Sequence, residues 1–324
     1  MPLTGLHHVT LVTADARANV AFYRDLLGLR LVKKTVNFDD PSAYHLYYGN
    51  ADASPGSLIT FFEWKGVGRG LTGIGGTHHI ALRVADDAAL LNWKRYLTDR
   101  GIKTYGVYDR RYFRSLYFRD PEGQTLELAT DGPGFLADGE PADQLGETFQ
   151  DVPPEFTTDS PRRTALADRT HPEPVPTITD DMRLRTGMHH LTATASDMAS
   201  THDFFHDLLG LRRVKQTGNF DGGDMAHYYW STGDGEPGTL VTYFEATPGT
   251  RRSRMGAGHT HHYALSIPTE AEQTTLQRRL MEAGLRVSPV QDRVYFRSIY
   301  TNDPDGHIVE VATAGPGFAV DEDA

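Results

Sequence analysis

The chain of 324 residues contains no cysteine. This absence excludes disulfides, zinc–thiolate sites, iron–sulfur clusters and cysteine nucleophiles. Any bound metal must therefore take nitrogen and oxygen ligands, a donor set that suits Fe(II), Mn, Zn, Ni or Cu.

The sequence also lacks long apolar runs and an excess of positive charge. No apolar run approaches the roughly 20 residues that span a bilayer, and the first residues show neither the basic nor the apolar region of a secretory signal. We therefore expect a cytoplasmic protein without a membrane partner. The net charge of −11 also argues against nucleic acid as a partner, because binding to the phosphate backbone depends on clustered Lys and Arg.

Two halves of the chain are similar in sequence. Residues 22–30 recur as residues 204–212, and Asp109-Arg110 recurs as Asp292-Arg293. The copies are 182 residues apart in the first part of each half and 183 apart in the second. Repetition at a fixed distance indicates a tandem duplication, and the length suits about two domains.

Each half divides once more into two modules, and each module opens on a histidine pair. The pairs are His7-His8, His78-His79, His189-His190 and His261-His262. An apolar strand follows each pair, then a helix, then three further short strands separated by turn residues. In the first module, Asp15 is the expected helix cap and Gly28 the expected helix end.

The expected fold is α+β, with four βαβββ modules arranged as two similar domains whose curved mixed sheets enclose a metal-binding cavity. The first domain covers residues 1–135, with modules at about 1–65 and 74–135. An acidic, proline-rich linker covers 136–185. The second domain covers 186–320, with modules at about 186–247 and 256–320. We expect Lys33, Lys34 and Lys215 to be solvated charges at strand edges.

The histidine pairs are candidate metal ligands. Because successive side chains of a strand point to opposite faces, at most one histidine of each pair can bind a metal on a given face. Alignment of the modules places four second histidines in register: His8, His79, His190 and His262. The alternative for any single histidine is a polar residue that ends a strand.

The best indicators of a site are Glu127 and Glu310, which lie among apolar residues late in the second and fourth modules. A carboxylate buried on a strand is costly unless it is paired or bound to metal. One interpretation is a salt bridge to Arg110 or Arg293. The other is a triad of two histidines and one carboxylate, which leaves coordination positions open on Fe(II).

Paired βαβββ modules with a histidine on the first strand and a glutamate on the last resemble the vicinal oxygen chelate superfamily, which contains glyoxalases, bleomycin-resistance proteins and extradiol dioxygenases. Residues 6–10, 32–35 and 44–47, with the fourth module, are similar to the ring-cleaving hydroquinone dioxygenases. The resemblance covers nearly the whole chain except the linker.

This resemblance implies Fe(II), with Mn(II) as the alternative, bound by His8, His262 and Glu310. The other residues that match the family's site are His7, Thr10, His261, Arg293 and Tyr300. It implies that both atoms of O₂ enter an aromatic diphenol of the hydroquinone or catechol type. Arg293 and Tyr300 also have a purely structural interpretation, as a partner of Asp292 and as a tyrosine packed in a sheet.

The duplication supplies a complete second set of ligands, His190, His79 and Glu127, which either binds a second metal or is silent. A further alternative completes the fourth-module site with His190 in place of His8.

Two other functions stay open. The first is a glyoxalase-like Zn or Ni lyase or isomerase, which needs a second carboxylate, with Glu63 and Glu245 as candidates. The second is a binding protein of the same fold without catalysis. The sequence leaves open the ring substituents, the position of cleavage, Fe against Mn, and whether the chain forms a homo-oligomer.

Overall fold

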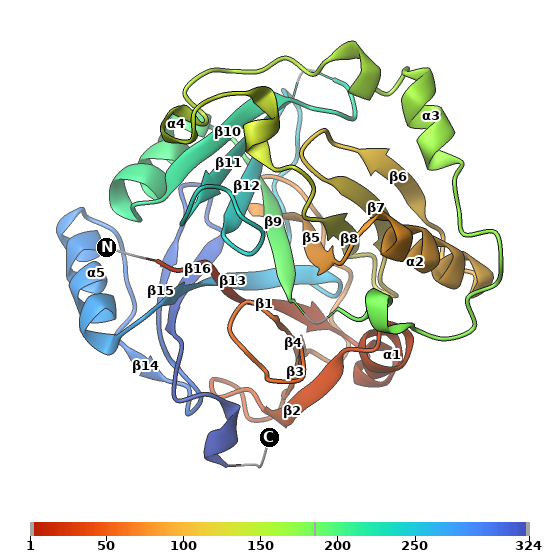
Figure 1. Ribbon diagram of the computed structural model, residues 1–324. Coiled ribbons are helices and arrows are strands. Elements are labelled where there is room, and N and C mark those ends of the chain that lie inside the picture. The colour runs from red at the N-terminus through yellow and green to blue at the C-terminus, as the bar shows by residue number, and fades with distance from the viewer. Residues whose placement is uncertain (1–2, 185, 224, 322–324) are drawn as a thin grey trace.

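The structure is a computed structural model that describes residues 3–184, 186–223 and 225–321. It contains two eight-stranded mixed sheets, and each sheet takes one module from each half of the chain (Figure 1). Modules one and four form the first sheet, and modules two and three form the second. The boundaries of the two domains predicted from the sequence stay a prediction. Each hydrogen-bonded sheet, however, combines strands from both halves of the chain.

The centre of the first sheet is β1, which pairs antiparallel with β13 and parallel with β4. In Figure 1 the red β1 lies beside the light-blue β13, although about 250 residues separate them along the chain. The strands follow in spatial order: β14 (Gln291–Asp292), β15 (Arg297–Asn302), β16 (Ile308–Thr313), β13 (His259–Ile267), β1 (Leu6–Thr13), β4 (Leu58–Glu63), β3 (Tyr44–Gly49) and β2 (Arg30–Val36).

The second sheet repeats this arrangement, with β5 and β9 as its antiparallel central pair. Its strands follow in spatial order: β10 (Arg212–Gly218), β11 (Ala226–Ser231), β12 (Leu240–Glu245), β9 (Met188–Ala195), β5 (Gly76–Val84), β8 (Thr125–Thr130), β7 (Arg114–Arg119) and β6 (Tyr105–Asp109). The predicted α+β fold of four βαβββ modules is therefore confirmed.

Each module carries one helix between its first and second strands: α1 (Ala16–Val20), α2 (Asp87–Asp99), α4 (Met198–His202) and α5 (Glu270–Glu282). In the first and third modules the helix continues in π-helical geometry, over Ala21–Leu26 and Asp203–Leu208. As predicted, Asp15 caps α1, since its carboxylate accepts hydrogen bonds from the Arg17 and Ala18 amides. Gly28 follows the helical segment with φ 71°, a conformation that favours glycine.

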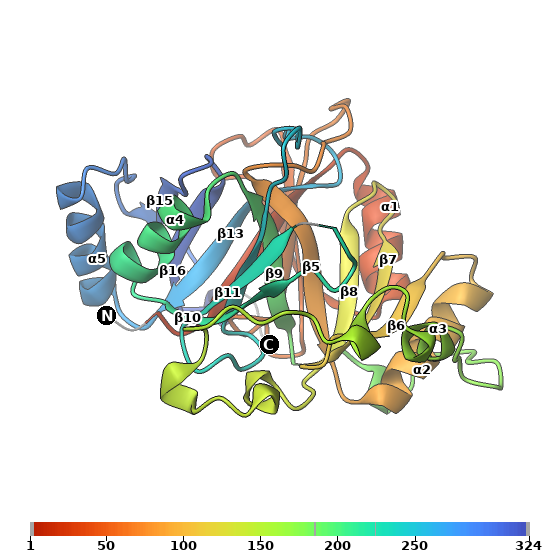
Figure 2. The ribbon, with the colours of Figure 1, turned by 90° about the horizontal axis from the view of Figure 1, so that it is seen from above.

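The central strands β1 and β9 are buried at every residue because both of their faces are covered. On β1, Val9 and Leu11 join the large apolar core. The alternate residues His8 and Thr10 are also buried, but their side chains make polar contacts with other strands. Figure 2 shows α5 and α2 towards opposite ends of the molecule, with the strands between them. The fold therefore places polar residues of the central strands in the interior, where a buried site can form.

The described part of the predicted linker 136–185, residues 136–184, packs against the second sheet. It contains α3 (Pro161–Ala167) and short 3₁₀ turns at Phe135–Asp138, Ala142–Gln144, Pro154–Phe156 and Asp180–Met182. Lys215 is fully buried and forms an ion pair with Asp138, and Lys33 is buried and forms an ion pair with Asp321. The expectation that these two lysines are solvated is therefore wrong, whereas Lys34 is exposed. Arg163 of α3 forms a second ion pair, with Asp221. Among the described residues, no helix has the length and apolar character to cross a membrane.

Candidate metal centre

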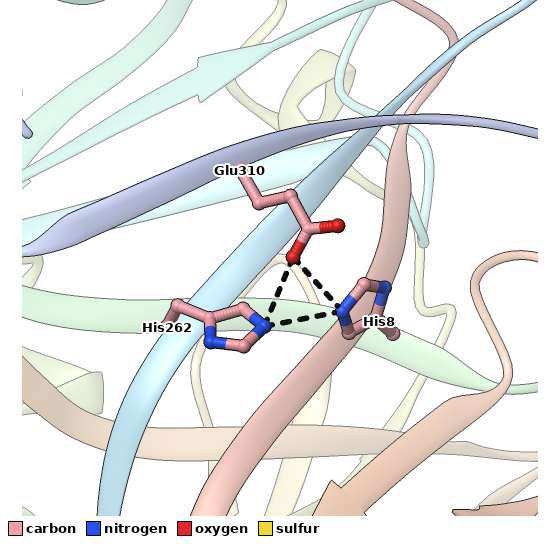
Figure 3. A group of neighbouring side chains, drawn as sticks. All are labelled: His8, His262 and Glu310. Carbon is pink, nitrogen blue, oxygen red and sulfur yellow. Dashed lines mark hydrogen bonds and ion pairs between the residues drawn. The ribbon is translucent and has the colours of Figure 1, made fainter. Parts of the chain in front are cut away.

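Three strands of the first sheet bring together His8 from β1, His262 from β13 and Glu310 from β16 (Figure 3). The Nε2 atoms of His8 and His262 lie 3.3 Å apart. The Oε2 atom of Glu310 lies 3.3 Å from Nε2 of His8 and 3.0 Å from Nε2 of His262. All three side chains are buried.

These distances fit the ligands of one metal ion. Ligand atoms about 2.1 Å from an ion lie about 3.0 Å apart at right angles and about 3.4 Å apart at tetrahedral angles. The Ser298 hydroxyl donates a hydrogen bond to Oε1 of Glu310. Oε2 of Glu310, by contrast, is buried and accepts no hydrogen bond from the described residues. An orphaned carboxylate oxygen that faces two imidazole nitrogens is the environment that a divalent cation stabilises.

His7 fixes the orientation of the His8 ring. Nδ1 of His7 lies 2.9 Å from Nδ1 of His8, and Nε2 of His7 lies 3.2 Å from the Thr313 carbonyl oxygen. That carbonyl can only accept, so it assigns the proton of His7 to Nε2 and leaves Nδ1 of His7 as an acceptor for Nδ1–H of His8. Nε2 of His8 then keeps its lone pair for a metal. Burial, followed by the neighbouring His8, lowers the pKa of His7 to about 3, so His7 stays neutral.

The pairing of β1 with β13 shifts register between Leu6 and His8, which is a β-bulge. Such a bulge adds one unpaired residue to a strand and changes the direction of its side chains. His7 is therefore able to lie edge-on to His8, with ring centroids 5.1 Å apart. As the sequence predicted, one histidine of the pair joins the cluster and the other does not.

The cluster faces a cavity of about 470 Å³ that has aromatic walls and several polar groups. Its lining includes Phe62, Trp64, Phe296, His45, Tyr47, Asn37, Asp39, His261, Arg293, Tyr300, Ser288 and Gln291, together with His8 and His262. A mostly apolar space with a few polar side chains near the ligands suits a small aromatic molecule.

Arg293 and Tyr300, which the sequence singled out, both line this cavity. Nε of Arg293 donates to the Tyr300 hydroxyl at 3.2 Å, and an amino group of Arg293 donates to Asp39 of the first module at 2.9 Å. The structural alternative paired Arg293 with Asp292, but the Asp292 carboxylate accepts from the Val294 amide instead. Burial raises the pKa of Tyr300, and the negative charge of Glu310 raises it further, so the hydroxyl keeps its proton.

His261 also lines the cavity, where its ring lies edge-on to Phe62 and Trp64. Its Nδ1 lies 2.8 Å from Nδ1 of His262, which repeats the contact between His7 and His8. Burial, then His262, lowers the pKa of His261 to about 3. His261 is therefore a neutral imidazole beside the candidate ligands.

Thr10 lies on β1, two residues after His8, and takes part in a chain of hydrogen bonds. Its hydroxyl is 2.8 Å from that of Thr60, which is 2.9 Å from Nε2 of His45. Nδ1 of His45 is in turn 2.8 Å from the Tyr47 hydroxyl. Sequence reasoning missed the roles of Thr60, Tyr47 and Ser298. Their repetition at Thr242, Tyr229 and Ser115 is the signal that could have identified them.

The second sheet builds the other predicted set, His79 from β5, Glu127 from β8 and His190 from β9. His190 therefore lies with His79 and Glu127, and the alternative in which it completes the fourth-module site is not the arrangement observed. The proposed salt bridges from Arg110 or Arg293 to the glutamates are not observed either. Among the described residues, Arg110 instead pairs with Asp221, and Glu310 contacts histidines and a serine.

The position of Glu63 bears on the glyoxalase-like alternative. In the pairing of β1 with β4, His8 is opposite Leu58, whereas Glu63 is opposite Thr13, five residues further along the strand. At about 3.3 Å per residue, this places Glu63 roughly 16 Å from the ligand. Glu63 instead accepts a hydrogen bond from the Ala16 amide. Within the described chain, neither Glu63 nor Glu245 belongs to either cluster.

The sequence profile of the Glyoxalase/Bleomycin resistance protein/Dioxygenase superfamily matches residues 5–128 and 187–311, most of the chain. The chain belongs to this superfamily. The two matched segments are the two halves of the duplication, and each contains two modules.

Relatives in this superfamily match nearly the full length. MhqA of Bacillus subtilis (strain 168), named as a candidate ring-cleaving dioxygenase, is 33% identical over 99% of this chain and 90% of its own. MhqO of the same organism, named likewise, is 32% identical over 98% of this chain and 87% of its own. Chlorohydroquinone/hydroquinone 1,2-dioxygenase of Sphingobium indicum is 28% identical over 98% of this chain and 87% of its own. These relatives support a dioxygenase.

Solved structures agree on the fold. A candidate dioxygenase from Bacillus subtilis has a TM-score of 0.75 and 30% identity, covering 99% of this chain and 88% of that one. Glyoxalase I from Zea mays has a TM-score of 0.62 at 14% identity, covering 96% of this chain and 92% of that one. At that identity, the similarity to glyoxalase I concerns the fold alone.

Proposed function

We propose that this chain is a non-haem Fe(II)-dependent dioxygenase that cleaves the ring of hydroquinone- or catechol-type aromatics, with Mn(II) as the alternative metal. The proposal depends mainly on one observation. His8, His262 and Glu310 converge inside an aromatic-walled cavity, and the names of the relatives agree with it. Two histidines and one carboxylate leave positions open for a substrate and O₂.

The three ligands would hold Fe(II) at one end of the cavity. When bound, this ion supplies the redox chemistry that brings a diphenol and O₂ to reaction. The chain itself supplies the position of the ring. Phe296 lies against His8, with ring centroids 5.2 Å apart, and Phe62 and Trp64 stack with an interplanar angle of 8°. These faces orient a planar ring and exclude water from it.

Three side chains are suited to move protons and stabilise negative charge. Tyr300 carries a protonated hydroxyl that lies next to the Arg293 guanidinium, so this pair can donate hydrogen bonds to a substrate oxyanion. His261 is a neutral imidazole that faces the same cavity. Because its Nδ1 accepts from Nδ1–H of His262, its own proton lies on Nε2, which can donate a hydrogen bond to a substrate oxygen. A role in aromatic degradation or quinone detoxification follows from this chemistry.

The test is O₂ consumption after anaerobic loading with Fe(II), with hydroquinone and catechol as substrates. We expect uptake with at least one diphenol, and its loss in His8→Ala, which removes one ligand. The matched control is His206→Ala, which removes an exposed imidazole that lines neither cavity. Tight metal binding without uptake on either diphenol would refute the proposal.

A further inference from the structure

The second cluster repeats the geometry of the first. Oε2 of Glu127 lies 3.0 Å from Nε2 of His79 and 3.4 Å from Nε2 of His190, and the two nitrogens are 3.1 Å apart. The Ser115 hydroxyl donates to Oε1 of Glu127, whereas Oε2 accepts no hydrogen bond from the described residues. A buried carboxylate oxygen without a hydrogen bond, facing two imidazole nitrogens, again suits a cation.

The surrounding hydrogen bonds are repeated as well. His189 contacts His190 through their Nδ1 atoms at 2.9 Å, as His7 contacts His8. The Thr192 hydroxyl is 2.7 Å from that of Thr242, which is 2.8 Å from Nε2 of His227. The groups that orient the ligands are therefore present around the second cluster too.

This second cluster faces a cavity of its own, of about 390 Å³. The two cavities differ in lining residues other than the candidate metal ligands. The positions of Ser288, Gln291, Thr301 and Asn302 in the first cavity are taken in the second by Tyr105, Tyr108, Phe118 and Arg119. The second cavity is therefore more aromatic, and it carries an additional guanidinium.

The two cavities also differ in the charged side chains at their walls. In the first, the lining contains Arg293 and its partner Asp39, whose charges cancel. In the second, Asp221 is shared by Arg110 and by Arg163, which comes from the linker helix α3.

Arg119 adds a further cation to the second cavity. It is exposed, and its side chain forms no ion pair with the described residues. The lining thus holds two arginines, Arg110 and Arg119, against the single carboxylate of Asp221, which also pairs with Arg163, and this balance leaves a positive charge that favours anions.

We propose that the second cavity is a second metal centre, bound by His79, His190 and Glu127, and that it takes an aromatic diol bearing an anionic group such as a carboxylate. The metal would hold the diol, as in the first cavity, and Arg119 would bind the anionic group at the rim. For the chemistry of the bound diol, this inference rests on the proposed function. The difference in selectivity lies mainly in the second module, which supplies Arg119, and the linker helix α3 adds Arg163 as a partner of Asp221.

The first arm of the test is metal content after anaerobic reconstitution, measured by elemental analysis on the full chain. We expect two ions per chain in the wild type and one in each of Glu127→Gln and Glu310→Gln. Glutamine keeps the size of the side chain and an oxygen for the serine hydroxyl, so these variants should fold. One ion in the wild type, lost in Glu310→Gln but kept in Glu127→Gln, would overturn the second centre and leave the proposed function standing. A chain that binds no metal would overturn both.

The second arm uses the Glu310→Gln protein, in which only the second centre is complete. The probes are 2,5-dihydroxybenzoate and hydroquinone, and their binding is measured under anaerobic conditions by calorimetry. We expect tighter binding of the benzoate, weakened roughly three- to tenfold by Arg119→Gln, the range for one charge-assisted contact at a partly exposed site.

The matched control for this arm is Arg278→Gln, which removes the same charge from an exposed position on α5 that lines neither cavity. Equal binding of the two probes, or equal effects of the two arginine variants, would overturn the selectivity.

Discussion

Substitution of His7 by phenylalanine tests whether the contact between paired histidines prepares a metal ligand. His7 is buried, and it connects His8 at 2.9 Å to the Thr313 carbonyl at 3.2 Å. Phenylalanine can fill the same space beside Phe296 but makes neither hydrogen bond. Nδ1 of His8 then loses its partner, and the ring is free to adopt the tautomer whose Nε2 is protonated.

The magnitude follows from the role of such partners. Loss of a group that orients a metal-binding histidine typically weakens metal binding 10- to 100-fold, about 1.4–2.7 kcal/mol. The unpaired Thr313 carbonyl should also lower the free energy of unfolding by about 1–3 kcal/mol. Metal affinity and stability should therefore both fall, although His7 itself is not one of the three converging ligands.

The assay is competition with a chromophoric chelator in the Glu127→Gln background, in which only the first cluster is complete. His189→Phe in that background is the matched control, since it removes the equivalent contact from the other sheet. We expect His7→Phe to weaken metal binding at least tenfold more than the control does. Equal affinities in two folded proteins would refute the idea that the first histidine of each pair orients the second.

Three further predictions concern stability. Burial, then His259, lowers the pKa of His307 to about 3, so the stability that neutral His307 confers is complete above about pH 6.5 and is lost as pH falls towards 3. The variant His307→Gln copies Gln124 of the second module. Urea titrations between about pH 3 and 6.5 should show that its unfolding free energy depends less steeply on pH, by about 1.4 kcal/mol per pH unit. An unchanged slope would contradict this. Trp93→Ala should cost about 3–5 kcal/mol in chemical denaturation, because Trp93 is fully buried and donates to the Met182 carbonyl at 2.8 Å; a loss below 1 kcal/mol would be inconsistent with that packing. Removal of bound metal by a chelator should lower the melting temperature. The corresponding loss of unfolding free energy is about 2.7 kcal/mol per site, relative to a protein with free metal at 100 times Kd. An unchanged melting temperature would argue against a metal-stabilised native state.

The sequence by itself determined the modules and the chemical types of the ligands. Repetition at 182 and 183 residues, the capped helix at Asp15 and the strand patterns predicted four βαβββ units that the structure contains. These features are local, because the period of apolar residues, a cap and a turn each depend on a few neighbouring residues. A glutamate within an apolar strand, such as Glu310, is a local feature of the same kind.

Only the tertiary structure decided which modules share a sheet. The backbone hydrogen bonds along a strand edge are nearly independent of sequence, and the first strands of the four modules are alike, so β1 could have paired with any of three others. Its pairing with β13 sends His8 to His262 and Glu310 and leaves His190 for the other cluster. The contacts of Asp39 with Arg293 and of Arg163 with Asp221 join segments far apart in sequence. They exist only because the sheets assemble in this order.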